Sequence, residues 1–244
     1  MSHLVIDIGN SRTKIAIFDD HKLVKNDVLE DLTEEKLRDY LKENSIQQSI
    51  ISSVRDGIER LENVLIEQTV YIRFSAALNT NINNQYKSPE TLGLDRLAGV
   101  IGAKALYPGE NCLVIDLGTC ITYDAIDNDN VYKGGSISPG LNMRLRAMHE
   151  LTGRLPLIPL DDFDGSEGNN TGTSMLSGVV NGTFLEMAGF IEQYRAQYSE
   201  LRVILCGGDA NFFDTRLKNS IFAHTLKTEP DLVLIGLNEV INQQ

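Results

Sequence analysis

One stretch of the sequence occurs twice. The segment LVIDIGNSRTKIAIF near the amino terminus returns, in looser form, as LVIDLGTCITYDAID. An offset of 109 residues superimposes Asp7 on Asp116 and Gly9 on Gly118, together with most of the apolar residues around them. Self-similarity at a fixed spacing indicates an internal duplication. The chain is therefore predicted to contain two related halves.

Each copy has the pattern of a β-hairpin. An apolar run of strand length ends in an acid, a glycine and small polar residues follow, and a second strand-like stretch completes the unit. The glycine allows backbone N–H groups to approach a phosphate, and the acid can hold a hydrated cation that bridges phosphate oxygens. One such motif is weak evidence, because Asp and Gly are ordinary turn residues. Two copies predict a nucleotide cleft between two facing hairpins.

The charge of the chain limits its partners. Acidic residues outnumber basic ones by 34 to 22, which gives a net charge of −12 and a pI near 4.8. This balance argues against nucleic acid or an anionic membrane as the main partner. An anionic substrate must then be held by local groups.

Cysteine and histidine usage points away from metal or disulfide chemistry. Cys112, Cys120 and Cys206 are odd in number and lack metal-ligand spacing, and the four histidines form no zinc or catalytic pattern. Neither a signal peptide nor an apolar stretch of membrane-spanning length is present. We therefore expect a cytoplasmic protein with reduced thiols.

The first half reads as mixed α/β. Strands are expected at 21–29, 47–54 and 69–74, and helices at 33–44, 58–68 and 92–106. In the first helix Leu37 and Leu41 should face inward, and in the third one face should carry Leu97, Val100, Ile101 and Leu106. The turn-rich segment YPGEN is the expected junction between an N-terminal domain, 1–108, and a C-terminal domain, 109–244.

The second half repeats this plan. After its hairpin we expect a turn at 128–130, a loop that leads into a helix near Leu141, and a further loop at 152–170. A long helix at 171–198, a strand that ends at Cys206, a Gly-Gly turn with a helix, and a closing helix from Asp231 should follow.

Two such halves around a cleft resemble the actin, sugar-kinase and Hsp70 ATPase superfamily, whose duplicated domains are ribonuclease H-like. Within it, the chain resembles the type III pantothenate kinases nearly end to end. The matching motifs are DIGNSRTK from Asp7, PETLGLDR from Pro89 with Tyr86 before it, DLGTCITYD from Asp116, GGSISPG from Gly134, Asn170 and Thr171 with Ser177 and Gly178, and CGGDA from Cys206. In the last motif Cys206 replaces the family's threonine.

The resemblance implies a reaction and a set of site residues. The reaction is transfer of the ATP γ-phosphoryl group to the primary hydroxyl of pantothenate, which gives 4′-phosphopantothenate in the first step of coenzyme A biosynthesis. Contacts to ATP are implied for Asp7, Ile8, Gly9, Asn10, Ser11, Arg12, Thr13, Lys14 and Thr119. Contacts to the substrate are implied for Tyr86, Gly93, Leu94, Asp95, Arg96 and Thr171.

Four of these residues have a specific role in the substrate site and also a simpler explanation. Asp95 would orient the hydroxyl and accept its proton, or it could cap the helix that begins there. Arg96 would bind the substrate carboxylate or a phosphate, or pair with a neighbouring acid. Tyr86 would hydrogen-bond the substrate, or anchor a loop by packing. Thr171 would reach the pantothenate of the other protomer in a homodimer, or cap its own helix.

The cations are implied in the same way. Asp7 would hold Mg²⁺, directly or through water, and Asp116 would bind a monovalent cation, K⁺ or NH₄⁺. Asp116 could instead be a second Mg²⁺ carboxylate. Asp124 is expected to support its hairpin and not to touch a ligand.

Two other functions remain open. Another small-molecule kinase or a phosphatase of the same fold would share both phosphate hairpins, but PETLGLDR and Tyr86 argue against it. A catalytically silent nucleotide-binding regulator would be expected to lack Asp95 or Lys14, and both are present.

Overall fold

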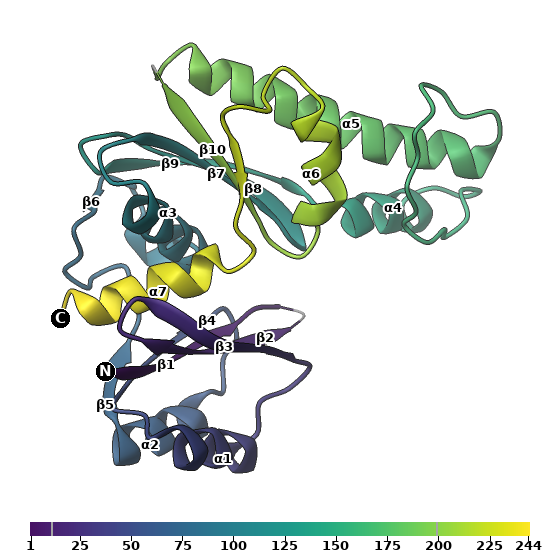
Figure 1. The fold of residues 1–244 in the computed structure, drawn as a ribbon. Coiled ribbons are helices and arrows are strands. Elements are labelled where there is room, and N and C mark those ends of the chain that lie inside the picture. Colours follow the sequence, from purple (N-terminus) through teal and green to yellow (C-terminus); the bar gives the residue numbers. More distant parts are fainter. Residues whose placement is uncertain (11, 199) are drawn as a thin grey trace. The chain divides into compact units, whose positions relative to one another are not determined.

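The computed structural model describes residues 1–10, 12–198 and 200–244. They form two compact units (Figure 1). Unit 1 consists of Met1–Gly109, Ile126–Gly134 and Asp231–Gln244, and unit 2 consists of Glu110–Ala125 and Gly135–Pro230. Each unit contains its own cluster of buried apolar side chains.

A five-stranded sheet lies at the centre of unit 1. Its elements are β1 (Ser2–Ile8), β2 (Thr13–Asp19), β3 (Lys22–Leu29), α1 (Glu34–Asn44), β4 (Gln48–Ser53), α2 (Glu59–Gln68) and β5 (Val70–Arg73). The strand order is β3-β2-β1-β4-β5. The first three strands are antiparallel neighbours, whereas β4 runs parallel to both β1 and β5. The helices α1 and α2 provide the crossovers that parallel neighbours require.

Helix α1 shows how the sequence pattern produces this layer. Thr33 caps the helix by accepting the N–H of Lys36 at 3.3 Å. Leu37 and Leu41, four residues apart, lie on one face and are both buried in the core of unit 1. The predicted inward face of this helix is confirmed.

Two helices from distant parts of the sequence, α3 (Leu94–Leu106) and α7 (Leu232–Asn242), pack closely in unit 1. A Cβ atom at Gly102 would lie 2.3 Å from the carbonyl oxygen of Leu232, and one at Gly236 would lie 1.9 Å from that of Ala98. Side-chain carbons cannot come this close, so glycine is required at both positions. The two backbones can then approach each other directly.

Helix α7 also packs on β1 and β4. At this contact His3 Nδ1 donates to Oδ1 of Asn238 at 2.9 Å, and both residues are buried. Nδ2 of Asn238 donates to the main-chain oxygen of Asp20 at 2.8 Å. The segment after Asp231 is therefore an integral part of unit 1.

The second sheet has six strands. They are β6 (Asn83–Asn84), β7 (Asn111–Leu117), β8 (Cys120–Ile126), β9 (Val131–Pro139), β10 (Leu201–Cys206) and β11 (Leu226–Thr228), in the order β11-β10-β7-β8-β9-β6. The helices of unit 2 are α4 (Leu141–Glu150), α5 (Thr171–Arg195) and α6 (Ala210–Lys218), and a short 3-10 helix, η1 (Pro89–Thr91), precedes α3. Together with the first sheet, this arrangement confirms the predicted mixed α/β class.

The sequence repeat has a structural counterpart. Strands β1 and β7 each contain seven residues, are related by the 109-residue offset and have the same succession of buried and half-buried positions. Asp7 and Asp116 occupy the same half-buried position near the end of their strands.

The compact units differ from the contiguous halves expected from the repeat. A change from unit 1 to unit 2 follows Gly109, inside the YPGEN segment, but unit 1 regains Ile126–Gly134 and Asp231–Gln244. The repeat concerns sequence similarity, whereas the units reflect packing. The division into 1–108 and 109–244 therefore stays a prediction.

Several local expectations need correction. The GGSISPG segment forms much of strand β9, although it was expected to be a loop. Leu106 is 39% exposed and does not join the buried face of α3. Helix α5 ends at Arg195, before the expected position at 198.

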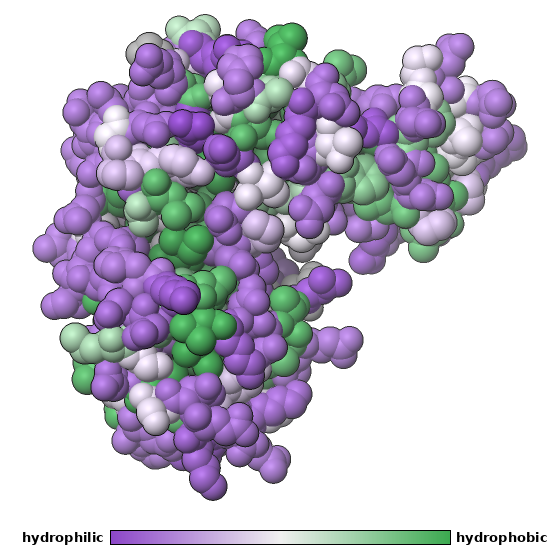
Figure 2. All heavy atoms as spheres, in the orientation of Figure 1, coloured by the Kyte–Doolittle hydropathy of each residue, from purple (hydrophilic) through white to green (hydrophobic). Residues whose placement is uncertain are grey.

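The visible surface is mainly hydrophilic (Figure 2), which agrees with the acidic composition. In the described part of the chain, no helix is long and apolar enough to cross a membrane.

Candidate functional site

The first hairpin places an acid beside a base. Asp7 on β1 is the direct cross-strand partner of Lys14 on β2, so both side chains point to the same face of the sheet. The N–H of Gly9 donates to the main-chain oxygen of Arg12 at 3.0 Å and closes the turn. The hairpin thus combines a carboxylate, an ammonium group and a tight glycine turn, which together suit a phosphate with its cation.

The other residues of this hairpin divide into two groups. Ile8 and Thr13 are 5% and 1% exposed, so only their backbone could contact ATP. Asn10 and Arg12 are exposed in the turn. The predicted contact Ser11 lies outside the described residues.

The predicted substrate residues Tyr86 and Arg96 come together in unit 1. The Arg96 guanidinium lies 5.6 Å from the centre of the Tyr86 ring, a distance suited to a cation–π contact. Tyr86 stacks on Tyr132 with 6.4 Å between ring centres and 8° between planes. A Cβ at Gly134 would lie 2.8 Å from two carbons of the Tyr86 ring, so this glycine leaves room for the aromatic stack.

This arrangement bears on the simpler explanations. Tyr86 does anchor its loop by packing, and Arg96 is 7% exposed with its guanidinium against that ring. Tyr132 was not among the predicted residues. An aromatic residue two positions before a glycine in a strand was the only signal for it.

Asp95 lies in the first turn of α3. Gly93 is the N-cap, and Asp95 is the second helical residue. Its Oδ1 accepts the backbone N–H of Arg96 at 2.8 Å, so the carboxylate satisfies a helix-end donor without being the N-cap. A Cβ at Gly93 would lie only 2.6 Å from the same Oδ1. The Gly-Leu-Asp-Arg sequence thus folds the carboxylate back over the glycine.

In unit 2 the second hairpin is supported by two glycines. A Cβ at Gly207 would lie 2.3 Å from Oδ1 of Asp116, and one at Gly140 would lie 2.5 Å from the carbonyl oxygen of Thr119. The N–H of Gly140 donates to that carbonyl oxygen at 3.1 Å. The CGGDA and GGSISPG segments therefore pack directly on the hairpin that carries Asp116, while Thr119 is exposed at its turn.

Cys206 is the departure from the family motif. It ends β10, is the direct neighbour of Asp116 in the parallel pairing with β7, and is 1% exposed. The Cys206 side chain is therefore buried within the sheet. Asp124 is also 1% exposed, as its expected supporting role requires.

Thr171 is the first residue of α5, and its side chain is exposed. The N-cap is Asn170, whose Oδ1 accepts the N–H of Thr173 at 3.0 Å within a capping box. The alternative that Thr171 caps its own helix is therefore wrong.

A half-buried ionic network, absent from the predictions, braces the end of β9 in unit 2. Arg144 on α4 donates to Oε2 of Glu186 on α5 at 2.6 Å, to Ser138 Oγ at 2.7 Å and to the main-chain oxygen of Pro139 at 2.8 Å. The hydroxyl of Tyr123 on β8 donates to Glu186 Oε1 at 2.8 Å.

The network changes the acidity of two of its members. Burial opposes ionisation of Glu186, but the hydrogen bonds from Arg144, Ser138 and Tyr123 outweigh it and lower the pKa of this carboxyl. Burial, followed by the hydrogen bond to Glu186, raises the pKa of the Tyr123 hydroxyl. The network is thus an ionised carboxylate held by neutral and cationic donors.

The comparison with protein families is decisive. Residues 3–193 match the family model described as type III pantothenate kinase. The chain belongs to the type III pantothenate kinase family. A type III pantothenate kinase of Phocaeicola vulgatus is 42% identical, with 98% of each chain covered. One from Christiangramia forsetii is 39% identical over 98% of this chain and 97% of its own.

Solved structures support the fold. A protein from Campylobacter jejuni, described as a Baf-family transcriptional activator, has a TM-score of 0.61 at 23% identity, and 98% of each chain is covered. A protein from Sinorhizobium meliloti, described as a 2-dehydro-3-deoxygalactonokinase, has a TM-score of 0.59 at 13% identity, with 99% of this chain and 98% of its own covered. The chain therefore has the duplicated, actin-like ATPase fold of this kinase superfamily, and as a type III pantothenate kinase it is an ATP-dependent enzyme.

A kinase of this family uses ATP with a divalent cation, and the residues present fit that use. In the described part of the chain, no group of three or more His, Cys, Asp or Glu could form a metal cage. Mg²⁺ needs no such cage, because one or two carboxylates together with the phosphates of ATP suffice to hold it. Asp7 at the first hairpin is a carboxylate of this kind.

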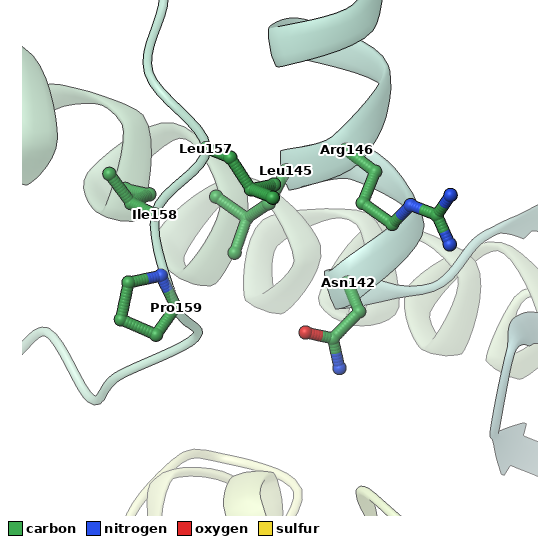
Figure 3. A pocket seen from close by; sticks show the side chains of 6 residues that line it. All are labelled: Asn142, Leu145, Arg146, Leu157, Ile158 and Pro159. Atoms are coloured by element: carbon green, nitrogen blue, oxygen red, sulfur yellow. The ribbon is translucent and has the colours of Figure 1, made fainter.

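The hollow in unit 2 shown in Figure 3 is a different place. It measures about 440 Å³ and is lined by Asn142, Leu145, Arg146, Leu157, Ile158 and Pro159. Three apolar side chains and a proline dominate its wall. None of the predicted site residues lines it, so it has no part in the assignment of the kinase residues.

Proposed function

We propose that this chain phosphorylates pantothenate with Asp95 as the residue that orients the primary hydroxyl and accepts its proton. The observation that carries the proposal is the intact Gly-Leu-Asp-Arg turn, in which Gly93 and the N–H of Arg96 hold one oxygen of the Asp95 carboxylate. A fixed carboxylate oxygen suits a reaction that depends mainly on positioning and charge neutralisation.

The first hairpin would bind the triphosphate. Lys14 would contact its terminal phosphates, and Asp7 would hold Mg²⁺ that bridges them. Asp7 and Lys14 are cross-strand partners, which places the carboxylate and the ammonium group side by side on one face of the sheet. This arrangement supports separate roles for them, with the metal at Asp7 and the phosphates at Lys14. The metal would neutralise phosphate charge, while Lys14 and the turn at Gly9 would orient the γ-phosphoryl group.

The second hairpin would bind a monovalent cation, K⁺ or NH₄⁺, through Asp116, and Thr119 would contact the ATP phosphates. The position of Asp116, equivalent to that of Asp7 in the repeat, and the glycine contact at Gly207 support a ligand role for its carboxylate. As a hard oxygen ligand it suits such a cation.

Arg96 and Tyr86 would bind the substrate. The guanidinium offers a planar pair of donors for the pantothenate carboxylate, and its contact with the Tyr86 ring restricts its orientation. We place the reaction in the cytoplasm, where the three cysteines, none of which forms a disulfide, would stay reduced.

We further propose a homodimer in which Thr171 completes the substrate site of the partner. Much of the apolar surface of α5 is used within unit 2, since Met175, Val179, Val180 and Met187 are buried there. Leu185 on the same helix remains 66% exposed. Beside it, an open groove of about 720 Å³ lies between α5 and residues 219–222 and includes Phe184, Ile221 and Phe222. This apolar surface supports an additional protein contact.

A coupled assay of ADP release tests the function. ADP should form only when pantothenate is present, faster with K⁺ than without it, and the product should carry one phosphate per pantothenate. ADP release at the same rate without pantothenate would contradict the assignment.

A further inference from the structure

Arg55 contacts the first hairpin, although none of the family motifs contains it. Its Nη2 donates to the main-chain oxygen of Asn10 at 2.9 Å. The backbone of Arg55 is fixed by Ser53, whose Oγ accepts the N–H of Arg55 at 3.0 Å and donates to its carbonyl oxygen at 2.8 Å. The arginine is therefore anchored at both its backbone and its guanidinium, beside the turn predicted to hold phosphate.

The charge of Arg55 has no carboxylate partner among the described residues, since the one hydrogen bond of its side chain there is that to Asn10. A guanidinium has five N–H donors, and most of them remain available for an anion. The whole chain carries a net charge of −12, so an anionic ligand must be attracted by such local cations.

The same end of β4 places a second polar group at the hairpin. Ser52 on β4 is the direct neighbour of Asp7 on β1, and Asp7 is the direct neighbour of Lys14 on β2. The three side chains therefore form one row across the sheet. Ser52 is 1% exposed, and within the described residues its Oγ has no hydrogen-bond partner. Burying a hydroxyl group without a hydrogen bond costs free energy of folding. Neighbouring strands lie about 5 Å apart, so Ser52 is close to the strand position that carries the Asp7 carboxylate.

We propose that the segment from Ser52 on β4 to Arg55 in the turn after this strand is a third element of the triphosphate site. Resting on the proposed function, the inference is that Arg55 binds the terminal phosphates of ATP together with Lys14. Ser52 donates its hydrogen bond to Asp7 when that carboxylate turns to hold the metal. This segment then supplies a second cation and a positioning hydroxyl to the first hairpin.

The test measures nucleotide binding by calorimetry without pantothenate, using Mg²⁺ with a non-hydrolysable ATP analogue, ADP or adenosine. Arg55→Gln keeps an N–H donor for the Asn10 carbonyl and removes the charge, whereas Arg55→Lys keeps the charge. Arg60→Gln, on the exposed side of α2, is the matched loss of one positive charge.

We expect Arg55→Gln to weaken binding of the ATP analogue about 10- to 100-fold, of ADP less, and of adenosine not at all, as loss of a charge-assisted contact to phosphate predicts. Arg55→Lys should recover part of the loss, and Arg60→Gln should bind as the wild type does. Ser52→Ala should weaken the ATP analogue about tenfold in Mg²⁺, with a smaller effect in the absence of metal.

Wild-type affinity for the ATP analogue in Arg55→Gln would overturn the role of Arg55, because that variant loses the positive charge and keeps an N–H donor for the Asn10 carbonyl oxygen. Equal affinity losses for all three nucleotides would also overturn it, since they would indicate a disturbed fold. Since no titration contains pantothenate, these results stay interpretable if pantothenate itself is not the substrate.

Discussion

Replacement of Gly93 by alanine isolates the position of the Asp95 carboxylate. The added Cβ would lie 2.6 Å from Asp95 Oδ1. An ordinary contact needs about 3.5 Å, so the carboxylate must move by roughly 0.9 Å. The backbone does not resist the change, because φ of Gly93 is −56°, a value that alanine adopts freely. The substitution therefore moves a side chain and leaves the chain path intact.

The expected result is a loss of turnover without a loss of fold. A displacement of about 1 Å at a reacting group can cost on the order of 100-fold in rate, so kcat should fall about 100-fold. Alanine restricts the unfolded chain by about 0.4–1 kcal/mol, and the weakened hydrogen bond from the Arg96 N–H to the Asp95 carboxylate costs a similar amount. The melting temperature should therefore change by no more than about 2–4 °C.

A double-mutant cycle with Asp95→Ala decides the cause. If the methyl group acts only through the carboxylate, then Gly93→Ala should have no further effect on kcat once that carboxylate is gone. Gly153→Ala is the control, because this glycine is exposed, lies outside every proposed site and has no atom within 4 Å of the added carbon. It should keep kcat and gain about 0.4–1 kcal/mol of stability. Full activity of Gly93→Ala, or an equal loss in both backgrounds, would refute the reasoning.

Three further predictions concern the cation, the dimer and the ionic network. Asp7→Ala should abolish use of Mg·ATP, and unchanged affinity in calorimetry together with an unchanged rate would remove Asp7 from the site. Light scattering should give about twice the chain mass of 27.1 kDa, and mixing an inactive Asp95→Asn protomer with an inactive Thr171→Val protomer should restore part of the activity; a fully active monomer would exclude a shared site. The pKa of Glu186 is lowered from 4.5, so its stabilisation is fully present above that pH and is lost as the pH falls through the lower, folded-state value. The melting temperature of Glu186→Gln should thus lie below that of the wild type at pH 7 and converge with it as the pH falls below the lowered pKa, whereas a pH-independent difference would argue against an ionised Glu186.

Elements with a strong periodic pattern could be predicted from the sequence. Leu37 and Leu41 fixed the inward face of α1, and the apolar run at the start of each repeat fixed β1 and β7. The two-residue strand β6 and the three-residue strand β11 could not be recognised, since so few residues show no alternation.

Helix α3 shows why a helix can be predicted correctly while part of its buried face is predicted wrongly. The spacing of large apolar residues assigned Leu106 to the interior, where it is 39% exposed. The contact with α7 is made by backbones that meet at Gly102 and Gly236. The spacing of large apolar residues cannot predict a contact of this kind, because glycines, which have no side chain, form it.

The site shows a similar division. Motif spacing was sufficient to propose Asp7, Lys14 and Asp95. Tyr132 and Arg55 could not be found in this way, because each reaches its neighbour, Tyr86 or Asn10, from a different strand or loop. Such contacts depend on the order of strands in the sheets, which a local sequence pattern does not reveal.

The packing of α7 has a consequence for biosynthesis. The sheet of unit 1 is made from residues before position 74, yet the buried partner of His3 is Asn238. During translation the ribosome must therefore produce all of unit 2 before unit 1 can cover β1 and β4. Until then their apolar surface is open to chaperones or to aggregation, and the segment from Asp231 onward acts as the final step that closes the first unit.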